Sequence, residues 1–552
     1  FAALVTQGWW RDQPNGRRGK EGAFAGVMIV RFADGTEKRF HTDDAWRGDY
    51  GGAFRLSGIF IGEIQDARVS MDWMKTGEFP ESFAKVKYND EFKGEIRPLQ
   101  GSPIRLRIED LKIAPTEIYV YDGVEGATAE QFGKVKKIRA YKEGDKMVLK
   151  PGETMIVDFG QNCAGKPNFT FSAARGTEVV VNVAEMLNDD MGKKSRKCDG
   201  PEGSLYRANY RGAPTEGKYF FKGEGEELFH PKFTFFGFRY VSMTATAPVV
   251  IRRIRSVPVT SIAKELEIGT IETGDKTLNR FIANVYWGQL SNYLSVPTDC
   301  PQRSERLGWA GDAQVFSEAA AYLSDIYAFM LKWSDDMTDS RDKNGNYVAA
   351  MPRGKFGYAS PMRFAWCDAA IICPYRAWMA SGDDGVIRRN WAAMDRYARN
   401  VDAVRYRLDG RAKSAADWLS KERYERWGRN GETTAGCDKD PNAHAFYNFL
   451  GGCYWLQDAR MMERMAVAIG RPEAAKFYRE SARRAVEMLR TEFLEKDGGV
   501  LNSMSDMQAP AAFAIAHGIL DEKGLRLTGE RLLANIRAHG GCLQAGCRNP
   551  CQ

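Results

Sequence analysis

The spacing of apolar residues changes once along this chain, near Pro258, and this change constrains the fold most strongly. Before it, short runs rich in β-branched and aromatic residues, such as residues 27–32, alternate with turn signals such as Asp122-Gly123. This pattern is typical of β-strands. From Asp275 onward, apolar residues recur every three or four positions, which indicates amphipathic helices. The sequence therefore predicts an all-β first part followed by an all-α second part.

The second part contains windows with helical spacing, separated by loops rich in glycine, proline and asparagine. These windows are residues 275–293, 313–337, 368–381, 386–405, 442–469, 472–493, 507–518 and 521–538. Long helices in pairs with irregular loops between them favour an α/α toroid, in which pocket residues lie on the loops at one end. A closed (α/α)6 barrel needs six such pairs, so these windows predict an incomplete barrel.

Composition excludes two classes of function. The net charge of +7 is spread along the chain, whereas a nucleic-acid-binding protein would show a basic stripe. The chain has no apolar run approaching the ~20 residues that span a bilayer, so we predict no membrane partner. The aromatic content of 12% suits carbohydrate recognition and the core of a large β-sandwich equally well.

The stretch from Pro297 to Asp312 concentrates the residue types of a sugar-binding pocket. It reads P-T-D-C-P-Q-R-S-E-R-L-G-W-A-G-D. Its prolines and glycines predict an irregular loop. Carboxylates and guanidiniums bind hydroxyl groups through charge-assisted hydrogen bonds, and an indole offers a flat apolar face to a sugar ring.

Within this stretch, Glu305 is our candidate for a proton donor, because Asp299, Asp312 and Trp309 surround it in sequence. Neighbouring carboxylates and an apolar wall raise the pKa of a carboxylic acid, as a donor near neutral pH requires. A simpler interpretation stays open at this point. The acids could form a solvated loop or a structural ion-pair network, with Asp312 capping a helix that starts at Ala313.

The pattern D-C-P-Q-R-x-E-R-x-G-W-x-G-D resembles the active-site motif of bacterial α-L-rhamnosidases, a family of inverting glycosidases. Residues 7–11, 33–47 and 62–68 resemble the family's amino-terminal sandwich, and residues 157–165, 184–187 and 230–240 resemble its concanavalin-like sandwich. The resemblance implies amino-terminal β-sandwich domains followed by an (α/α)6 toroid catalytic domain. The expected domains are residues 1–125, 126–258 and 259–552.

By resemblance, Glu305 is the general acid, and Asp299, Arg303 and Asp312 hold the hydroxyls of the sugar. Trp309 forms an apolar wall, together with Trp366 of a W-x-D-A segment and Trp418 of an A-D-W-L segment that resembles the family's G-D-W-L. Such walls suit the methyl group of a 6-deoxy sugar. The expected partner is a rhamnose-containing oligosaccharide or glycoside, with no cofactor and no metal, and a homodimer stays open. The spacing of His539, Cys542, Cys547 and Cys551 departs from that of usual zinc sites.

An inverting glycosidase also needs a carboxylate that activates water. The family places this base near a T-x-W-E-like segment, which this sequence does not contain. We therefore expect the chain to be truncated at both ends or to diverge at its carboxyl end. Two alternatives stay open, namely a non-catalytic carbohydrate-binding remnant and another (α/α)6 glycosidase or phosphorylase.

Overall fold

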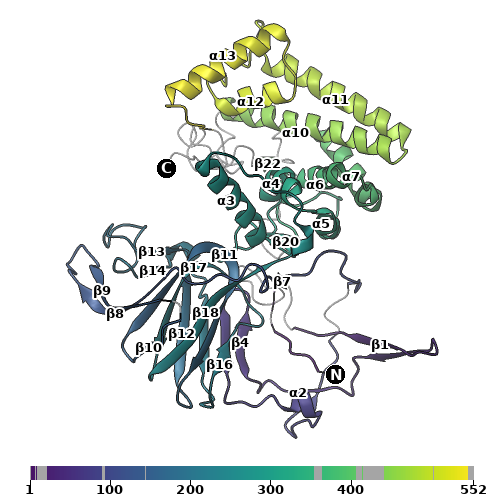
Figure 1. Ribbon diagram of the computed structural model, residues 1–552. Coiled ribbons are helices and arrows are strands. Elements are labelled where there is room, and N and C mark those ends of the chain that lie inside the picture. The colour runs from purple at the N-terminus through teal and green to yellow at the C-terminus, as the bar shows by residue number, and fades with distance from the viewer. Residues whose placement is uncertain are drawn as a thin grey trace.

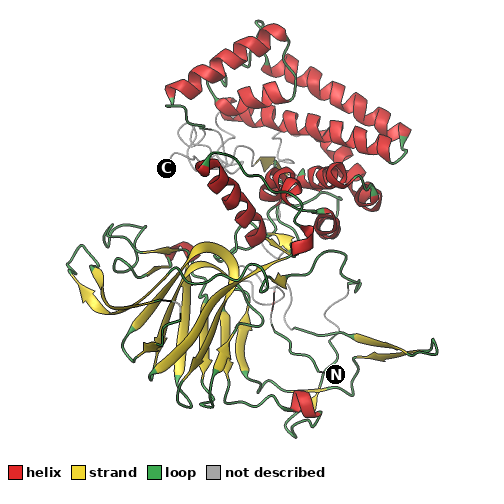
Figure 2. Cartoon of the chain, viewed as in Figure 1, coloured by secondary structure: helices red, strands yellow, loops and turns green. Residues whose placement is uncertain are grey.

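The computed structural model describes residues 2–6, 8, 22–89, 94–142, 144–353, 363–405, 413–414, 441–501 and 503–544. The long β-strands and the long helices occupy separate parts of the molecule (Figures 1 and 2), and the chain passes from one to the other after strand β18 (Val249–Thr260). The predicted change from strands to helices is therefore confirmed. No helix in the described part combines the length and apolar character needed to cross a bilayer.

The amino-terminal region contains several small, mostly exposed elements. Strands β1 (Val27–Arg31) and β2 (Glu37–His41) form an antiparallel hairpin whose turn contains Asp34 and Gly35. The left-handed backbone of Gly35 (φ 83°) and the Asp34 carboxylate, which accepts the Thr36 amide at 2.9 Å, close this turn. The other elements of this region are β3 (Arg47–Gly48), α2 (Trp73–Thr76), β6 (Ala84–Lys85) and β7 (Arg105–Leu106).

A large sheet follows, with the strand order β10-β18-β11-β17-β12-β15-β5-β4. Its strands are β4 (Phe54–Gly58), β5 (Gly62–Asp66), β10 (Met147–Leu149), β11 (Thr154–Ser172), β12 (Glu178–Ala184), β15 (Glu216–Phe220) and β17 (Phe236–Ala245), with β8 (Glu117–Glu125), β9 (Lys134–Tyr141) and β16 (Glu227–Phe229) paired beside this path. Strand β5 pairs with β15 in parallel, so the segment at residues 62–68 adds to the sheet of the following domain. The domain boundaries expected at residues 125 and 258 stay predictions.

The aromatic segment around β17 forms core. Phe236 and Phe238 are buried against Phe159, Phe169 and Val241, so the aromatic side chains stabilise the sandwich rather than forming a platform for a sugar. Strand β12 alternates buried and partly buried residues along its length, as a strand with one covered face does. Short strands β13 (Met186–Leu187) and β14 (Leu205–Tyr206) contact β17. The 3-10 helix η1 (Ala208–Tyr210) is held to β17 by the Tyr210 hydroxyl, which donates to the Gly237 carbonyl at 2.7 Å.

The helical part confirms seven of the predicted windows and corrects one. Its helices in the described residues are α3 (Lys276–Asn292), α4 (Ala310–Leu323), α5 (Tyr327–Asp339), α6 (Ala369–Ser381), α7 (Gly385–Val404), α10 (Pro441–Ala468), α11 (Pro472–Phe493), α12 (Gln508–Ala516) and α13 (Glu522–Ala538). The single helix predicted over residues 313–337 was wrong. Ser324 adopts an extended backbone and bridges to Glu267, and the Asp325 carboxylate accepts the Tyr327 amide at 3.0 Å, which ends α4 and starts α5.

Candidate active site

The acid-rich stretch joins the hairpin of β19 (Tyr293–Leu294) and β20 (Val296–Pro297) to helix α4. It forms the predicted irregular loop as far as Gly308, but α4 begins at Ala310 and not at Ala313. We call residues 298–308 the acid loop. Asp299 closes its neck, because its amide donates to the Leu307 carbonyl at 3.0 Å and its carboxylate accepts the Leu307 amide at 2.8 Å.

Arg306 fixes the acid loop to the β-sandwich. Its side chain is fully buried, and its guanidinium donates to the carbonyls of Ile59 and Gln302. The same guanidinium lies 5.1 Å from the ring centre of Phe60 and 5.7 Å from that of Phe235. Arg306 has a left-handed backbone (φ 53°), a conformation that non-glycine residues adopt when their surroundings require it. The loop conformation thus depends on contacts that come from two distant parts of the sandwich.

Gly237 on strand β17 allows this close approach. A Cβ atom at Gly237 would lie 2.8 Å from the Cβ of Gln302 and 2.9 Å from the ring of Pro301, closer than side chains normally pack. The absence of a side chain at Gly237 thus lets the acid loop pack directly on the backbone of β17.

The Glu305 carboxylate accepts hydrogen bonds from three side chains. The Trp309 indole nitrogen donates to Oε1 at 3.0 Å, while Arg303 Nε and Arg211 Nη1 donate to Oε2 at 2.8 and 3.0 Å. The Glu305 side chain is 21% exposed, so a substrate can reach it. Arg211 follows helix η1 of the sandwich and was not predicted. It lies 94 positions from Glu305 in sequence, and its neighbours carry no motif that would have marked it.

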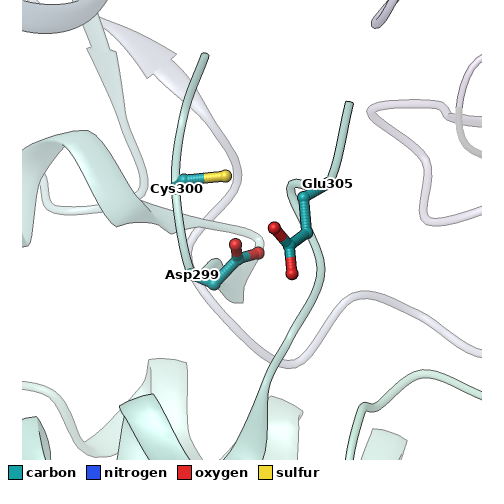
Figure 3. Close-up of side chains that lie close together, drawn as sticks. All are labelled: Asp299, Cys300 and Glu305. Carbon is teal, nitrogen blue, oxygen red and sulfur yellow. The ribbon is translucent and has the colours of Figure 1, made fainter. Parts of the chain in front are cut away.

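Asp299 is the more deeply buried of the two central acids. Its side chain is 4% exposed, and Arg303 Nη2 donates to it at 3.2 Å. Burial is the larger cause, and the negative charge of Glu305 the smaller one, that together raise the pKa of Asp299 to about 7. The loop turns the Asp299 side chain inward and leaves Glu305 partly exposed, and the role of Glu305 as proton donor stays a prediction. Figure 3 shows the two carboxyl groups facing one another.

Cys300 completes a group of three potential metal ligands, since its Sγ and the oxygens of Asp299 and Glu305 lie within 4.8 Å of one another (Figure 3). The group is poorly suited to a cation. Burial and the Asp299 charge raise the pKa of the Cys300 thiol, and metals bind the thiolate. Arg303 and Arg211 already pair with the carboxylates. The arrangement suits a neutral polar ligand better. Of the tail residues considered for zinc, Cys547 and Cys551 lie outside the described residues.

The remaining predicted site residues have different positions. Trp366, which follows β21 (Arg363–Phe364), packs on the first turn of α4, where a Cβ at Gly311 would come within 2.4 Å of its indole. Asp312 is exposed in that same turn, and because Trp309 is the N-cap residue, Asp312 is not the cap. A carboxylate in the first helical turn is favoured by the helix dipole. Trp418 lies outside the described residues.

The β-sandwich followed by paired helices is the architecture of the six-hairpin glycosidase class. Three family models match the chain in succession. They are the alpha-L-rhamnosidase N-terminal domain at residues 1–108, the bacterial alpha-L-rhamnosidase concanavalin-like domain at 148–260, and the bacterial alpha-L-rhamnosidase 6 hairpin glycosidase domain at 266–548. The chain belongs to the bacterial α-L-rhamnosidase family, and the fold class predicted by the resemblance is confirmed.

Individual relatives agree with this assignment. The chain is 27% identical to an alpha-L-rhamnosidase of Streptomyces avermitilis over 99% of its length and 25% identical to one of Formosa agariphila over 94%. It spans about half the length of these curated relatives, 46% and 50% respectively. The solved structure of the S. avermitilis enzyme complexed with L-rhamnose superposes with a TM-score of 0.73 at 26% identity, covering 94% of this chain and 43% of that one. The Dictyoglumus thermophilum enzyme shares the fold, with a TM-score of 0.75 at 23% identity over 94% of this chain and 52% of its own.

The anchoring role of Arg306 predicts a specific loss of stability. Arg306→Met should lower the free energy of unfolding by about 3 kcal/mol, because the carbonyls of Ile59 and Gln302 lose a charged hydrogen-bond donor. Chemical denaturation measures this change. Arg252→Met is the matched control, since Arg252 is half exposed and forms a surface ion pair with Glu226. Equal effects of the two substitutions would contradict the anchoring role.

The raised pKa of Asp299 predicts a pH dependence of stability. A carboxyl with a pKa near 3.8 when unfolded and about 7 when folded stabilises the fold below pH 4 and loses this contribution as the pH rises towards 7. Asp299→Asn should therefore raise the Tm, relative to the parent, more at pH 8 than at pH 5. Thermal unfolding across this range measures the difference. Asp34→Asn, at an exposed turn where hydrogen bonds lower the carboxyl pKa, should not show this trend. If Asp299→Asn changes the Tm by the same amount at every pH, the proposed titration of Asp299 is wrong.

Proposed function

We propose that this chain carries the general acid of an α-L-rhamnosidase, a glycoside hydrolase that removes terminal α-L-rhamnose from glycans or glycosides with inversion. The observation that carries the proposal is the Glu305 carboxyl group, partly exposed on an anchored loop and held by an indole and two guanidiniums. The complex of the S. avermitilis relative with L-rhamnose supports the choice of sugar.

Cleavage of a glycosidic bond passes through an oxocarbenium-like transition state, and the departing oxygen must receive a proton. Asp299 and Glu305 supply this proton as a pair. The pKa of Asp299, about 7, keeps a proton within the pair near neutral pH, and Arg303 contacts both carboxyl groups. Glu305 is the more accessible member, so it delivers the proton to the leaving oxygen while Asp299 and Arg303 hold it in position.

Asp299 is not the second carboxylate that either glycosidase mechanism requires. In both mechanisms, two carboxyl groups lie on opposite sides of the sugar, roughly 6.5–9.5 Å apart in inverting enzymes. Oxygens of Asp299 and Glu305 lie within 4.8 Å of each other, and Asp299 is almost completely buried, so no sugar ring fits between them. The base that activates water therefore comes from elsewhere in the protein.

The other site residues receive binding roles. Asp312 binds hydroxyls of rhamnose, and Trp309 and Trp366 form apolar walls around its ring and methyl group. Asp299 and Arg303, expected from the resemblance to bind hydroxyls as well, hold Glu305 in position, because Asp299 is almost completely buried and Arg303 contacts both carboxyl groups. Trp418, the third expected wall, lies outside the described residues. The support from geometry is strongest for Arg303 and Trp309, which contact Glu305 directly, and for Trp366, which packs on the turn that follows Trp309.

Substitution of the proposed acid tests this function. Glu305→Gln should lower kcat for a rhamnosyl-glucose disaccharide by about 10²–10⁴-fold with little change in KM, because the leaving sugar oxygen needs a proton. The loss should be smaller for p-nitrophenyl α-L-rhamnoside, whose leaving group departs more easily. Released rhamnose and p-nitrophenol are the two readouts.

Glu318→Gln is the control, because Glu318 lies on α4 and pairs with Arg376 at 2.7 Å, outside the acid loop. Unchanged turnover in Glu305→Gln would remove Glu305 from the acid role. Rhamnose binding without any release by the parent would favour the non-catalytic alternative, and phosphate-dependent release would favour a phosphorylase.

A further inference from the structure

A cavity of about 330 Å³ lies between the β-sandwich and helix α3, beside the acid loop. Asn162 and Glu185 line it from the sandwich, Asn284, Trp287 and Gly288 line it from α3, and Gln302 lines it from the acid loop. Asp299 and Arg303 also border it, so the cavity touches the two residues that surround the proposed acid. In Figure 1, α3 is the long helix nearest to the sheet, with β11 beneath it.

The polar groups of the cavity are fixed in place. The Glu185 carboxylate accepts amide hydrogens from Asn162 and Gln302, both at 2.9 Å, and from Asn209 at 3.3 Å. The amide oxygens of Gln302 and Asn209 are buried and have no hydrogen-bond partner in the described part of the chain. Since these two oxygens are shielded from solvent, the acceptor that a ligand can use is the Glu185 carboxylate, which can accept about four hydrogen bonds and accepts three from these amides. Trp287 adds an apolar indole surface of the kind that sugar rings pack against.

The position of the cavity relative to Glu305 indicates which part of a substrate would occupy it. Oε1 of Glu305 faces Trp309, whose helix turn contacts Trp366, and this side carries the walls expected for rhamnose. Oε2 faces Arg303, which borders the cavity. A general acid protonates the oxygen that joins the sugar to its leaving group, so the leaving group lies across the acid from the rhamnose ring.

We propose that this cavity binds the sugar to which rhamnose is attached, a second pyranose recognised through its hydroxyls. The proposal rests on the proposed function. The volume lies at the lower end of the roughly 300–1,000 Å³ range of ligand pockets, which suits one ring. Glu185 binds its hydroxyls, and Trp287 packs against its apolar face. The β-sandwich thereby contributes to the choice of the leaving group.

Gly288 provides a way to fill the cavity without disturbing the fold. A Cβ atom built at Gly288 meets no other atom within 4 Å, although the residue lies inside helix α3. Gly288→Leu should extend a side chain into the free space. Gly288→Ala is the matched control, because it raises helix propensity by about 1 kcal/mol and leaves most of the cavity open.

The test compares binding of α-L-rhamnosyl-(1→6)-D-glucose with binding of L-rhamnose by calorimetry, in a Glu305→Gln background that prevents turnover. The parent and Gly288→Ala should bind the disaccharide about tenfold more tightly than rhamnose, as one or two hydrogen bonds to the second ring would provide. Gly288→Leu and Glu185→Gln should reduce this ratio to near one and leave the Kd for rhamnose within about twofold.

An unchanged ratio in both Gly288→Leu and Glu185→Gln would overturn the second-sugar site. If Gly288→Leu also loses rhamnose binding, its fold is disturbed and Glu185→Gln decides the question. Failure of the proposed function gives a different result, because the parent would then bind neither ligand or would continue to release heat of hydrolysis despite Glu305→Gln.

Discussion

The site depends on one buried guanidinium. Arg306 is fully buried, donates to the backbone carbonyls of Ile59 and Gln302, and packs on the rings of Phe60 and Phe235. A buried charge is costly unless its hydrogen-bond partners stay in place. The side chain therefore makes the loop conformation and the sandwich-to-helix contact a single cooperative unit.

Within that unit, two acids of similar chemistry acquire different properties. The backbone turns Asp299 inward against the Leu307 amide, whereas Glu305 points towards donors from the loop, the sandwich and α4. Burial raises the pKa of one carboxyl, and the other stays accessible. Pairs of acids whose surroundings differ in this way are typical of sites that move protons. The sandwich takes part directly, since Arg211 extends from it to the carboxylate of Glu305.

The amino-acid sequence alone predicted the features of the fold and site that depend on local sequence patterns. The spacing of apolar residues and the turn residues predicted which regions form strands and which form helices. The density of acids, arginines and indoles predicted the loop that brings Asp299, Arg303, Glu305 and Trp309 together. The break at Ser324 was missed because apolar spacing continues across it, whereas the bridge to Glu267 and the hydrogen bond from the Tyr327 amide to Asp325 interrupt the helix. The burial of Asp299 and the contact of Arg211 arise from tertiary packing, which spacing along the chain does not report.

Strand β5 has a consequence for how the molecule can be divided. It joins the sheet beside β15, and the turn that leads into it contains the Ile59 carbonyl that receives Arg306. The segment matched by the family's amino-terminal domain model therefore supplies a carbonyl that holds the acid loop in place. A fragment that starts at the concanavalin-like region would lack that carbonyl and one edge of its sheet. The three matched regions are consequently not structurally independent, because the acid loop contacts residues from all three.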